Sequence, residues 1–263
     1  MLWLANWMVD VDQGQLTGCL KPPGSYTFGG HDATHCDLEG EMQVEWYGQS
    51  AFRLAAGPMT VVIDPFGDVS GFAGRGIQFE YPAIDGVSPD LVLVTHEHID
   101  HNGVEAVGGE PAVLRSTAGR LQSPLGEVLA VASEHDPAAG TERGPNTIFA
   151  FDLDGVRVVH FGDFGQRSLR EEQVAAIGHV DLLFLPVSAG PTIDAEQAAS
   201  VVERLGPKWV VPMHYRTPRI GFLETADAFL ELMPRVQRMH AATFDTAEIS
   251  IEDAPLVIVP TAP

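Results

Sequence analysis

This sequence of 263 residues is short of cysteine and of long apolar runs, and each shortage excludes a class of protein. The two cysteines, Cys19 and Cys36, are too few for a disulfide framework, so a reducing, cytoplasmic setting is expected. No apolar stretch approaches the length of a membrane span. The apolar N-terminus lacks a basic region and meets Asp10 and Asp12 at once, which argues against a signal peptide.

Positive charge is also scarce. There are 15 basic residues against 36 acidic ones, and the net charge is −21. A surface of this kind repels phosphate backbones, so the sequence argues against a nucleic-acid partner and favours a small-molecule substrate. The pattern leaves open whether the chain forms a homo-oligomer.

Two parts of the chain differ in composition. Residues 1–41 are rich in Gly, Pro, Thr and Asp and lack sustained periodicity, so they are predicted to form an irregular N-terminal extension. Met42 is an alternative translation start under this interpretation. Residues 42–263 alternate apolar strands with amphipathic helices and are predicted to form one α/β domain.

Local patterns predict individual elements of that domain. Asp154-Gly155 predicts a tight turn inside a hairpin over 147–163. Ser168 with Glu171, and Asp194 with Gln197, have the spacing of a capping box at a helix start. The remaining expectations are strands over 42–52, 59–65, 91–95, 180–188, 208–215 and 255–260, and helices over 168–178, 194–206 and 225–233.

The segment "LVLVTHEHIDHNG" places three of the ten histidines within six positions, directly after an apolar strand. In extended backbone His96, His98 and Asp100 point to the same side, because side chains alternate with a period of two. A turn after them can bring His101 toward Asp100. Imidazole and carboxylate groups without thiolates suit zinc, manganese or iron.

Further ligand-type residues end other predicted strands. His135 lies in "ASEHD", Asp163 in "VVHFGDFG" and His214 in "VVPMHY". Sites in α/β sheets gather at strand ends, so these side chains are expected to join the histidine segment. His160 has an odd offset from Asp163 along its strand, which favours a hydrogen-bonded core histidine.

Taken together, these motifs resemble those of the metallo-β-lactamase superfamily. "THEHIDHNG" matches its H-x-H-x-D-H signature, and "VVIDPF", "SEHD", "HFGDFG" and "PMHY" fall where its other motifs belong. "WYGQSAFRL" and the segment from "LPVSAG" to "PMHY" are similar to the branch of small metal-dependent hydrolases that includes L-ascorbate-6-phosphate lactonase. The resemblance implies a four-layer αββα sandwich with the site at one edge of two sheets.

The same resemblance implies two divalent metal ions, with zinc favoured and manganese as the alternative. It also implies that Asp64 lies behind the ligands and orients one of them. The ligands that it assigns are His96, His98 and His135 for the first ion, Asp100, His101 and His214 for the second, and Asp163 as the bridge between them.

The chemistry expected from such a site is hydrolysis. A hydroxide that bridges two metal ions would attack a small ester, lactone, amide or phosphoester, with Asp100 and Asp64 as the catalytic carboxylates. Arg216 and Arg219, which follow His214, are expected to bind an anionic part of the substrate. Gln49 stands where relatives of this branch often have His. Gln can donate a hydrogen bond but cannot donate a proton, so any proton transfer by that His is altered here.

Two other activities are known on the same scaffold. A phosphodiesterase or nuclease is one alternative, and the net charge of −21 argues against the nuclease. A di-iron oxidoreductase is less favoured, because such relatives tend to carry Glu where His98 stands in this chain.

Overall fold

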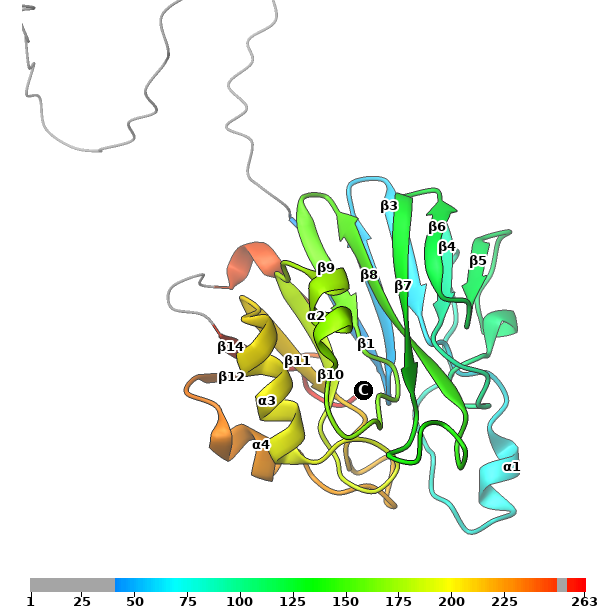
Figure 1. Ribbon diagram of the computed structural model, residues 1–263. Coiled ribbons are helices and arrows are strands. Elements are labelled where there is room, and N and C mark those ends of the chain that lie inside the picture. Colours follow the sequence, from blue (N-terminus) through cyan, green and yellow to red (C-terminus); the bar gives the residue numbers. More distant parts are fainter. Residues whose placement is uncertain (1–40, 250–254) are drawn as a thin grey trace, which may run out of the picture. The chain divides into compact units, whose positions relative to one another are not determined.

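Two β-sheets stack against each other and form the body of the structure (Figure 1). The computed structural model describes residues 41–249 and 255–263. The six-stranded sheet has the order β13 (Thr243–Asp245), β1 (Gln43–Gly48), β2 (Ala51–Ala56), β3 (Met59–Ile63), β4 (Leu91–Val94) and β5 (Ala112–Arg115). The eight-stranded sheet has the order β12 (Val236–Arg238), β14 (Leu256–Val259), β11 (Trp209–Met213), β10 (Leu182–Pro186), β9 (Val156–His160), β8 (Pro145–Leu153), β7 (Gly126–Glu134) and β6 (Gly119–Ser123).

The helices lie mainly over the outer face of the eight-stranded sheet (Figure 1). Within the described ranges they are α1 (Ser70–Ala73), α2 (Glu171–Ile177), α3 (Ala195–Leu205) and α4 (Asp227–Leu232), with 3₁₀ turns η1 (Val104–Ala106) and η2 (Thr246–Glu248). None of these helices is long and apolar enough to cross a membrane. The predicted α/β sandwich is confirmed, and its helical cover is uneven, because only α1 and η1 connect strands β3 to β5.

Local signals predicted one helix start correctly and another wrongly. Helix α3 begins at the Asp194–Gln197 capping box, as expected from the sequence. Helix α2 begins later than predicted, with Arg170 as its N-cap, and the side-chain oxygen of Gln173 accepts the Arg170 N–H. Ser168 therefore lies before the helix.

The predicted strand over 42–52 is in fact the start of a hairpin. Gly48 and Gln49 both have positive φ, at 110° and 54°, and this turn separates β1 from β2. The predicted extension over 1–41 falls outside the described residues apart from Glu41.

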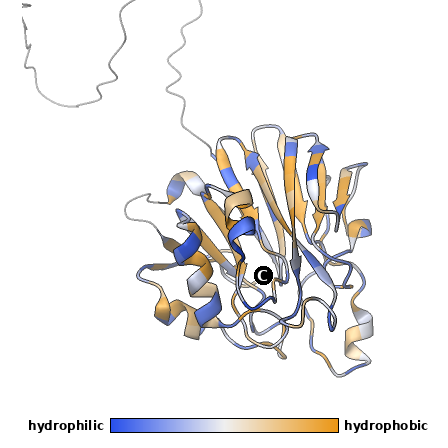
Figure 2. Cartoon of the chain, in the orientation of Figure 1, coloured by the Kyte–Doolittle hydropathy of each residue, from blue (hydrophilic) through white to orange (hydrophobic). Residues whose placement is uncertain are grey.

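The core lies between the two sheets. Figure 2 shows most strands in the hydrophobic colour, as expected for strands covered on both faces. Phe52 of β2 and Phe184 of β10 meet across the sheets with ring centroids 4.4 Å apart, and both are fully buried. His160 of β9 packs against both rings as a buried core residue, as its offset from Asp163 predicted.

Strand direction brings one set of loops to a common edge. In the first sheet β3 and β4 are parallel, and β1 runs the same way because two antiparallel pairings separate it from β3. In the second sheet β9, β10 and β11 are parallel, and β7 shares their direction for the same reason. All of these strands end at the lower edge of the molecule in Figure 1.

Candidate metal centre

Every predicted metal ligand, together with Asp64, follows one of these strands. Asp64 comes after β3, the residues from His96 to His101 after β4, His135 after β7, Asp163 after β9 and His214 after β11. The structure brings all of them together at the shared edge, although they span 151 positions of the chain, from 64 to 214. Parallel and same-direction strands explain the convergence, because their carboxyl ends meet at one side of the sheets.

One carboxylate oxygen stands at the centre of the cluster. Asp163 Oδ2 lies 3.2 Å from the Nε2 atoms of both His135 and His214, and 3.3 Å from Nε2 of His101. Nε2 of His96 is 3.9 Å away. Four imidazoles around one oxygen is the environment that a carboxylate shared between two cations would have.

The first predicted ligand trio is also assembled. His96, His98 and His135 offer ligand atoms that all lie within 4.8 Å of one another. Nε2 of His96 and Nδ1 of His98 are 3.0 Å apart. Two nitrogens that share a tetrahedral zinc ion at about 2.1 Å lie roughly 3.4 Å apart, so this spacing suits one metal ion.

Thr95 and Asp64 orient two of the imidazoles. The Thr95 hydroxyl donates to Asp64 Oδ2 at 2.7 Å, so it accepts from the Nδ1–H of His96 at 3.0 Å. Asp64 Oδ2 also accepts from the Nδ1–H of His101 at 3.0 Å. Both histidines therefore turn Nε2 toward the cluster, and this is the ring nitrogen with which each would bind a metal ion.

Strained backbone also occurs at this place. Asp64 and His214 both have positive φ, at 47° and 54°, as does Gln49 on the neighbouring hairpin turn. Such conformations are unfavourable for residues other than Gly and persist where the surroundings impose them. His214 is held by its carbonyl, which accepts from Ser188, and by its N–H, which donates to the Gln49 carbonyl.

Asp163 is fixed from behind by β8. Its N–H donates to Asn146 Oδ1 at 3.1 Å, and the Asn146 amide group donates to the carbonyl of Phe161. The preceding residue must be Gly162, which has φ of 55°. A Cβ there would lie 2.4 Å from Asn146 Oδ1 and 2.6 Å from Thr95 Oγ1.

Burial and neighbouring charges set the protonation of the cluster. Burial lowers the pKa of His96 well below its usual range, and the neighbouring His101 reinforces this. Burial alone would lower the pKa of His101, but Asp163, Asp100 and Asp64 raise it well above its usual range. Burial alone would raise the pKa of Asp163, yet His101 and His214 bring this pKa well below its usual value. The carboxylates thus favour a positive charge within the buried histidine cluster.

These residues fit a bound cation. Nε2 of His101 is buried and has no hydrogen-bond partner in the described part of the chain. The donor set is nitrogen and oxygen without sulfur, which suits zinc or manganese. Because the neighbouring carboxylates raise the pKa of His101, a proton competes with a metal ion for this residue.

Comparison with known proteins agrees with this geometry. A family profile described as "Beta-lactamase superfamily domain" matches residues 43–214, from the first strand to the last histidine of the cluster. The chain belongs to the metallo-β-lactamase superfamily.

Within it, the chain belongs to the UPF0173 metal-dependent hydrolase family. A member from Methylobacterium nodulans is 30% identical over 225 residues, covering 73% of this chain and 92% of the relative. A member from Methanoregula boonei is 29% identical over 198 residues, covering 67% and 83%. A solved Thermotoga maritima structure, described as a candidate Zn-dependent hydrolase of the superfamily, is 28% identical with a TM-score of 0.67, covering 83% of this chain and 98% of its own.

Gln49 occupies a special position in this member of the family. Its side chain is fully buried, and Nε2 donates to Asp100 Oδ2 at 3.2 Å. The oxygen of the same amide, Oε1, has no hydrogen-bond partner in residues 41–249 and 255–263. Asp100 Oδ2 lies 3.6 Å from Nε2 of His101, so Gln49 positions Asp100 at the edge of the cluster.

Gln49→Ala is expected to lower kcat by about tenfold with a smaller change in KM, because a hydrogen bond to a charged group is lost at Asp100. Gln49→His retains a donor and should recover part of the loss. Steady-state kinetics of the metal-loaded protein measure both. Gln43→Ala is the matched control, since Gln43 lies exposed on the same strand hairpin and binds Arg53. Equal kcat in Gln49→Ala and Gln43→Ala would contradict a positioning role.

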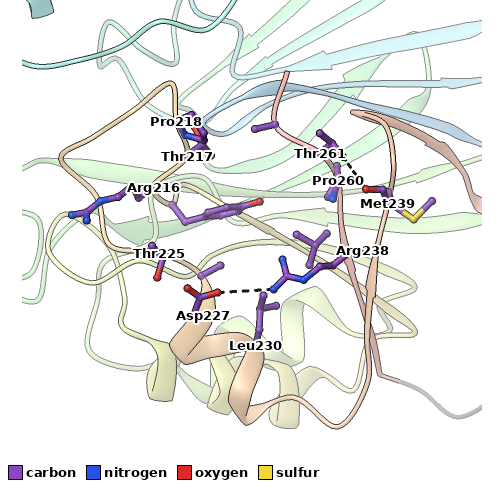
Figure 3. Close-up of a pocket in the computed structure, with 14 residues that line it drawn as sticks. Arg216, Thr217, Pro218, Thr225, Asp227, Leu230, Arg238, Met239, Pro260 and Thr261 are labelled. Carbon is purple, nitrogen blue, oxygen red and sulfur yellow. Dashed lines mark hydrogen bonds and ion pairs between the residues drawn. The ribbon is translucent and has the colours of Figure 1, made fainter.

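The two arginines expected to bind substrate lie elsewhere. Arg216 Nε donates to the Leu223 carbonyl, and Arg216 lines a different pocket of about 330 Å³. Figure 3 shows that pocket, with Asp227 and Arg238 paired across it. Arg219 Nε donates to the main-chain oxygen of Pro263. Neither arginine lines the pocket over the histidine cluster.

Some residues of the site had no clear sequence signal. Thr95 stands directly before the first motif histidine, and its place between a buried strand and the motif is the signal that could have revealed it. Gln49 was noticed as a departure from relatives, but its contact with Asp100 joins positions 51 residues apart. Arg75 and Arg143, which line the pocket over the cluster, stand in loops without any pattern.

Proposed function

We propose that this chain hydrolyses a small ester, lactone, amide or phosphoester with water activated by a pair of divalent metal ions. The observation that carries the proposal is the surrounding of Asp163 Oδ2 by four imidazole Nε2 atoms within 3.9 Å. The trio of His96, His98 and His135 beside it supports a second ion. Bound there, divalent ions would supply Lewis acidity and lower the pKa of water toward neutrality.

The protein's own residues then have separate tasks. Asp64 and Thr95 keep His101 and His96 in the ligand orientation. Asp100 lies at the pocket surface and is held by Gln49, so it is placed to accept and return a proton near the substrate. Ser50 Oγ, 3.4 Å from Asp163 Oδ1, holds the second oxygen of that carboxylate.

The size of the pocket limits the substrate. It has a volume of about 270 Å³, and its floor contains His98, Asp100, His135, Asp163 and His214. A space of this size accepts a small organic molecule rather than a polymer. The similarity of "WYGQSAFRL" to the branch that includes L-ascorbate-6-phosphate lactonase supports including lactones among the candidates.

The test is metal content followed by a substrate panel. Purified full-length protein should contain zinc or manganese, or take it up, and should hydrolyse at least one lactone, ester, amide or phosphodiester. Chelation should abolish the activity and the metal should restore it. His98→Ala is expected to lose it, whereas His240→Ala, an exposed histidine outside the cluster, should not.

A metal stoichiometry near zero that neither zinc nor manganese raises would defeat the proposal. Activity that survives both chelation and His98→Ala would defeat it as well.

A further inference from the structure

The wall of the pocket over the histidine cluster is built from two kinds of residue. Apart from five residues of the cluster itself, the lining consists of Phe72, Ile77, Ile99, Pro191 and Phe222, which are apolar, and of Arg75 and Arg143. Ile99 and Phe222 are 44% and 48% exposed, unusually high for large apolar side chains in this protein. No acidic residue lines the pocket outside the cluster.

Arg75 and Arg143 differ from the other basic residues of the described ranges, because their side chains have no polar partner there. Of the 15 basic residues, Lys21 lies outside the described ranges, which leaves 14. Twelve of these make an ion pair or a side-chain hydrogen bond, or have another electrostatic partner. The remaining two are Arg75 and Arg143, whose hydrogen bonds within the described residues are made only by their backbone N–H groups.

The backbone that carries Arg143 is held firmly. The Asp136 carboxylate accepts from the N–H groups of Ala138, Gly140, Glu142 and Arg143, at 2.8–3.1 Å. Asp136 directly follows the cluster residue His135, so the loop is tied to the metal centre. Arg75 follows α1, where its N–H donates to the Phe72 carbonyl. Both guanidinium groups therefore stand on anchored backbone, and their donors have no partner among residues 41–249 and 255–263.

We propose that Arg75 and Arg143 bind an anionic group of the substrate, a carboxylate or a phosphate monoester, while the apolar wall holds the rest of the molecule. The inference rests on the proposed hydrolase function, since the substrate's scissile group would lie over the cluster. The proposed anion site therefore consists of Arg75 and Arg143, and not of Arg216 and Arg219, which the sequence suggested.

Charge supports this assignment. In a chain with a net charge of −21 an anion is repelled from most of the surface, so a local pair of cations is needed to hold it. Free guanidinium groups offer planar, bidentate donors that match carboxylate and phosphate oxygens. Elsewhere in the described structure the basic side chains already make ion pairs, hydrogen bonds or other electrostatic contacts.

The test compares two esters that differ in one group. 4-Nitrophenyl butyrate is neutral, and mono-4-nitrophenyl succinate has a carboxylate where butyrate has its terminal methyl. Zinc-loaded full-length protein should prefer the succinate ester. Arg75→Ala and Arg143→Ala should each lower kcat/KM for that ester by about tenfold, mainly through KM, because a charge-assisted hydrogen bond is lost. The butyrate ester should be little affected.

Arg120→Ala is the matched control, because Arg120 is an exposed arginine on β6 that pairs with Glu127. It should leave both esters unchanged. Equal losses on the two esters in Arg75→Ala and Arg143→Ala, or no loss on either, would overturn the proposal.

A binding measurement separates this proposal from the hydrolase function. Titration calorimetry of zinc-loaded protein with inorganic phosphate and with succinate should give affinities that the Arg75→Ala/Arg143→Ala double variant weakens at least about tenfold. Tighter phosphate binding would indicate phosphate monoesters, and tighter succinate binding would indicate carboxylates. If neither ester is cleaved but the double variant loses anion binding, the arginine site stands and the ester chemistry fails. Equal binding of both anions by wild type and double variant, or no binding by wild type, would overturn the site.

Discussion

Asp163→Asn protein is expected to fold, to retain little metal and to lose at least about 100-fold in hydrolysis rate. Substitution of a residue that only hydrogen-bonds a metal ligand already costs about 10–100-fold in metal affinity or activity, and Asp163 is expected to be a ligand itself. Asp163 Oδ2 approaches the Nε2 atoms of His101, His135 and His214 at 3.2–3.3 Å. An amide nitrogen in its place would bring a donor and no charge to the point where the imidazoles converge. Metal analysis by mass spectrometry and kinetics on any substrate found by the panel measure both effects.

Asp152→Asn is the matched control for this substitution. Asp152 is an exposed carboxylate on β8 that pairs with Arg157, so its loss changes net charge by the same amount without touching the cluster. It should keep its metal and its activity. An Asp163→Asn protein with full metal content and wild-type kcat would show that the carboxylate is not a ligand.

Asp64→Asn is expected to weaken metal binding by about 10–100-fold, because Asp64 fixes the orientation of His101. It should also lower the free energy of unfolding of the metal-free protein. The Asp64 carboxylate accepts from Thr95 N–H, the Thr95 hydroxyl and His101 Nδ1, all of them donors. The NH₂ group of Asn would face at least one of these donors and could not accept its hydrogen bond. A buried donor left without an acceptor costs about 1–3 kcal/mol.

Asn is the informative substitution because it tolerates the positive φ of position 64, which is 47°. Backbone strain is therefore matched, and the change tests the carboxylate alone. Denaturant titration of the metal-free protein gives the stability term, and competition with a zinc indicator gives the affinity. Asp90→Asn, at an exposed carboxylate bonded to Thr60 N–H, serves as the control. Unchanged zinc affinity in Asp64→Asn would contradict the orienting role.

Much of the fold could be predicted from local patterns. Continuous apolar runs indicated β3, β4, β10 and β11, and Asp154-Gly155 indicated the hairpin turn between β8 and β9. These signals are local, since burial on both faces requires an unbroken apolar run and a tight turn requires residues that accept positive φ. The break between β1 and β2 was missed, because only one of its two left-handed residues is Gly.

The candidate ligands were also readable from the sequence, because the motif concentrates three histidines and an aspartate after one strand. The supporting contacts were not. Thr95 joins Asp64 to His96 only because β3 and β4 are parallel neighbours, and Gln49 reaches Asp100 only because the β1–β2 turn ends at the same edge. Arg216 and Arg219 were adjacent to His214 in sequence, yet the chain after His214 directs both toward other partners.

The sequence by itself determined the type of donor atoms, the spacing of the ligands and the strands that present them, because these depend on residue identity and on the two-residue period of a strand. Tertiary structure decided which side chains surround Asp163 and which arginines remain free to meet a ligand. Those outcomes depend on contacts between residues far apart in the chain, and only the packing of the two sheets and the course of their loops brings such residues within hydrogen-bond distance.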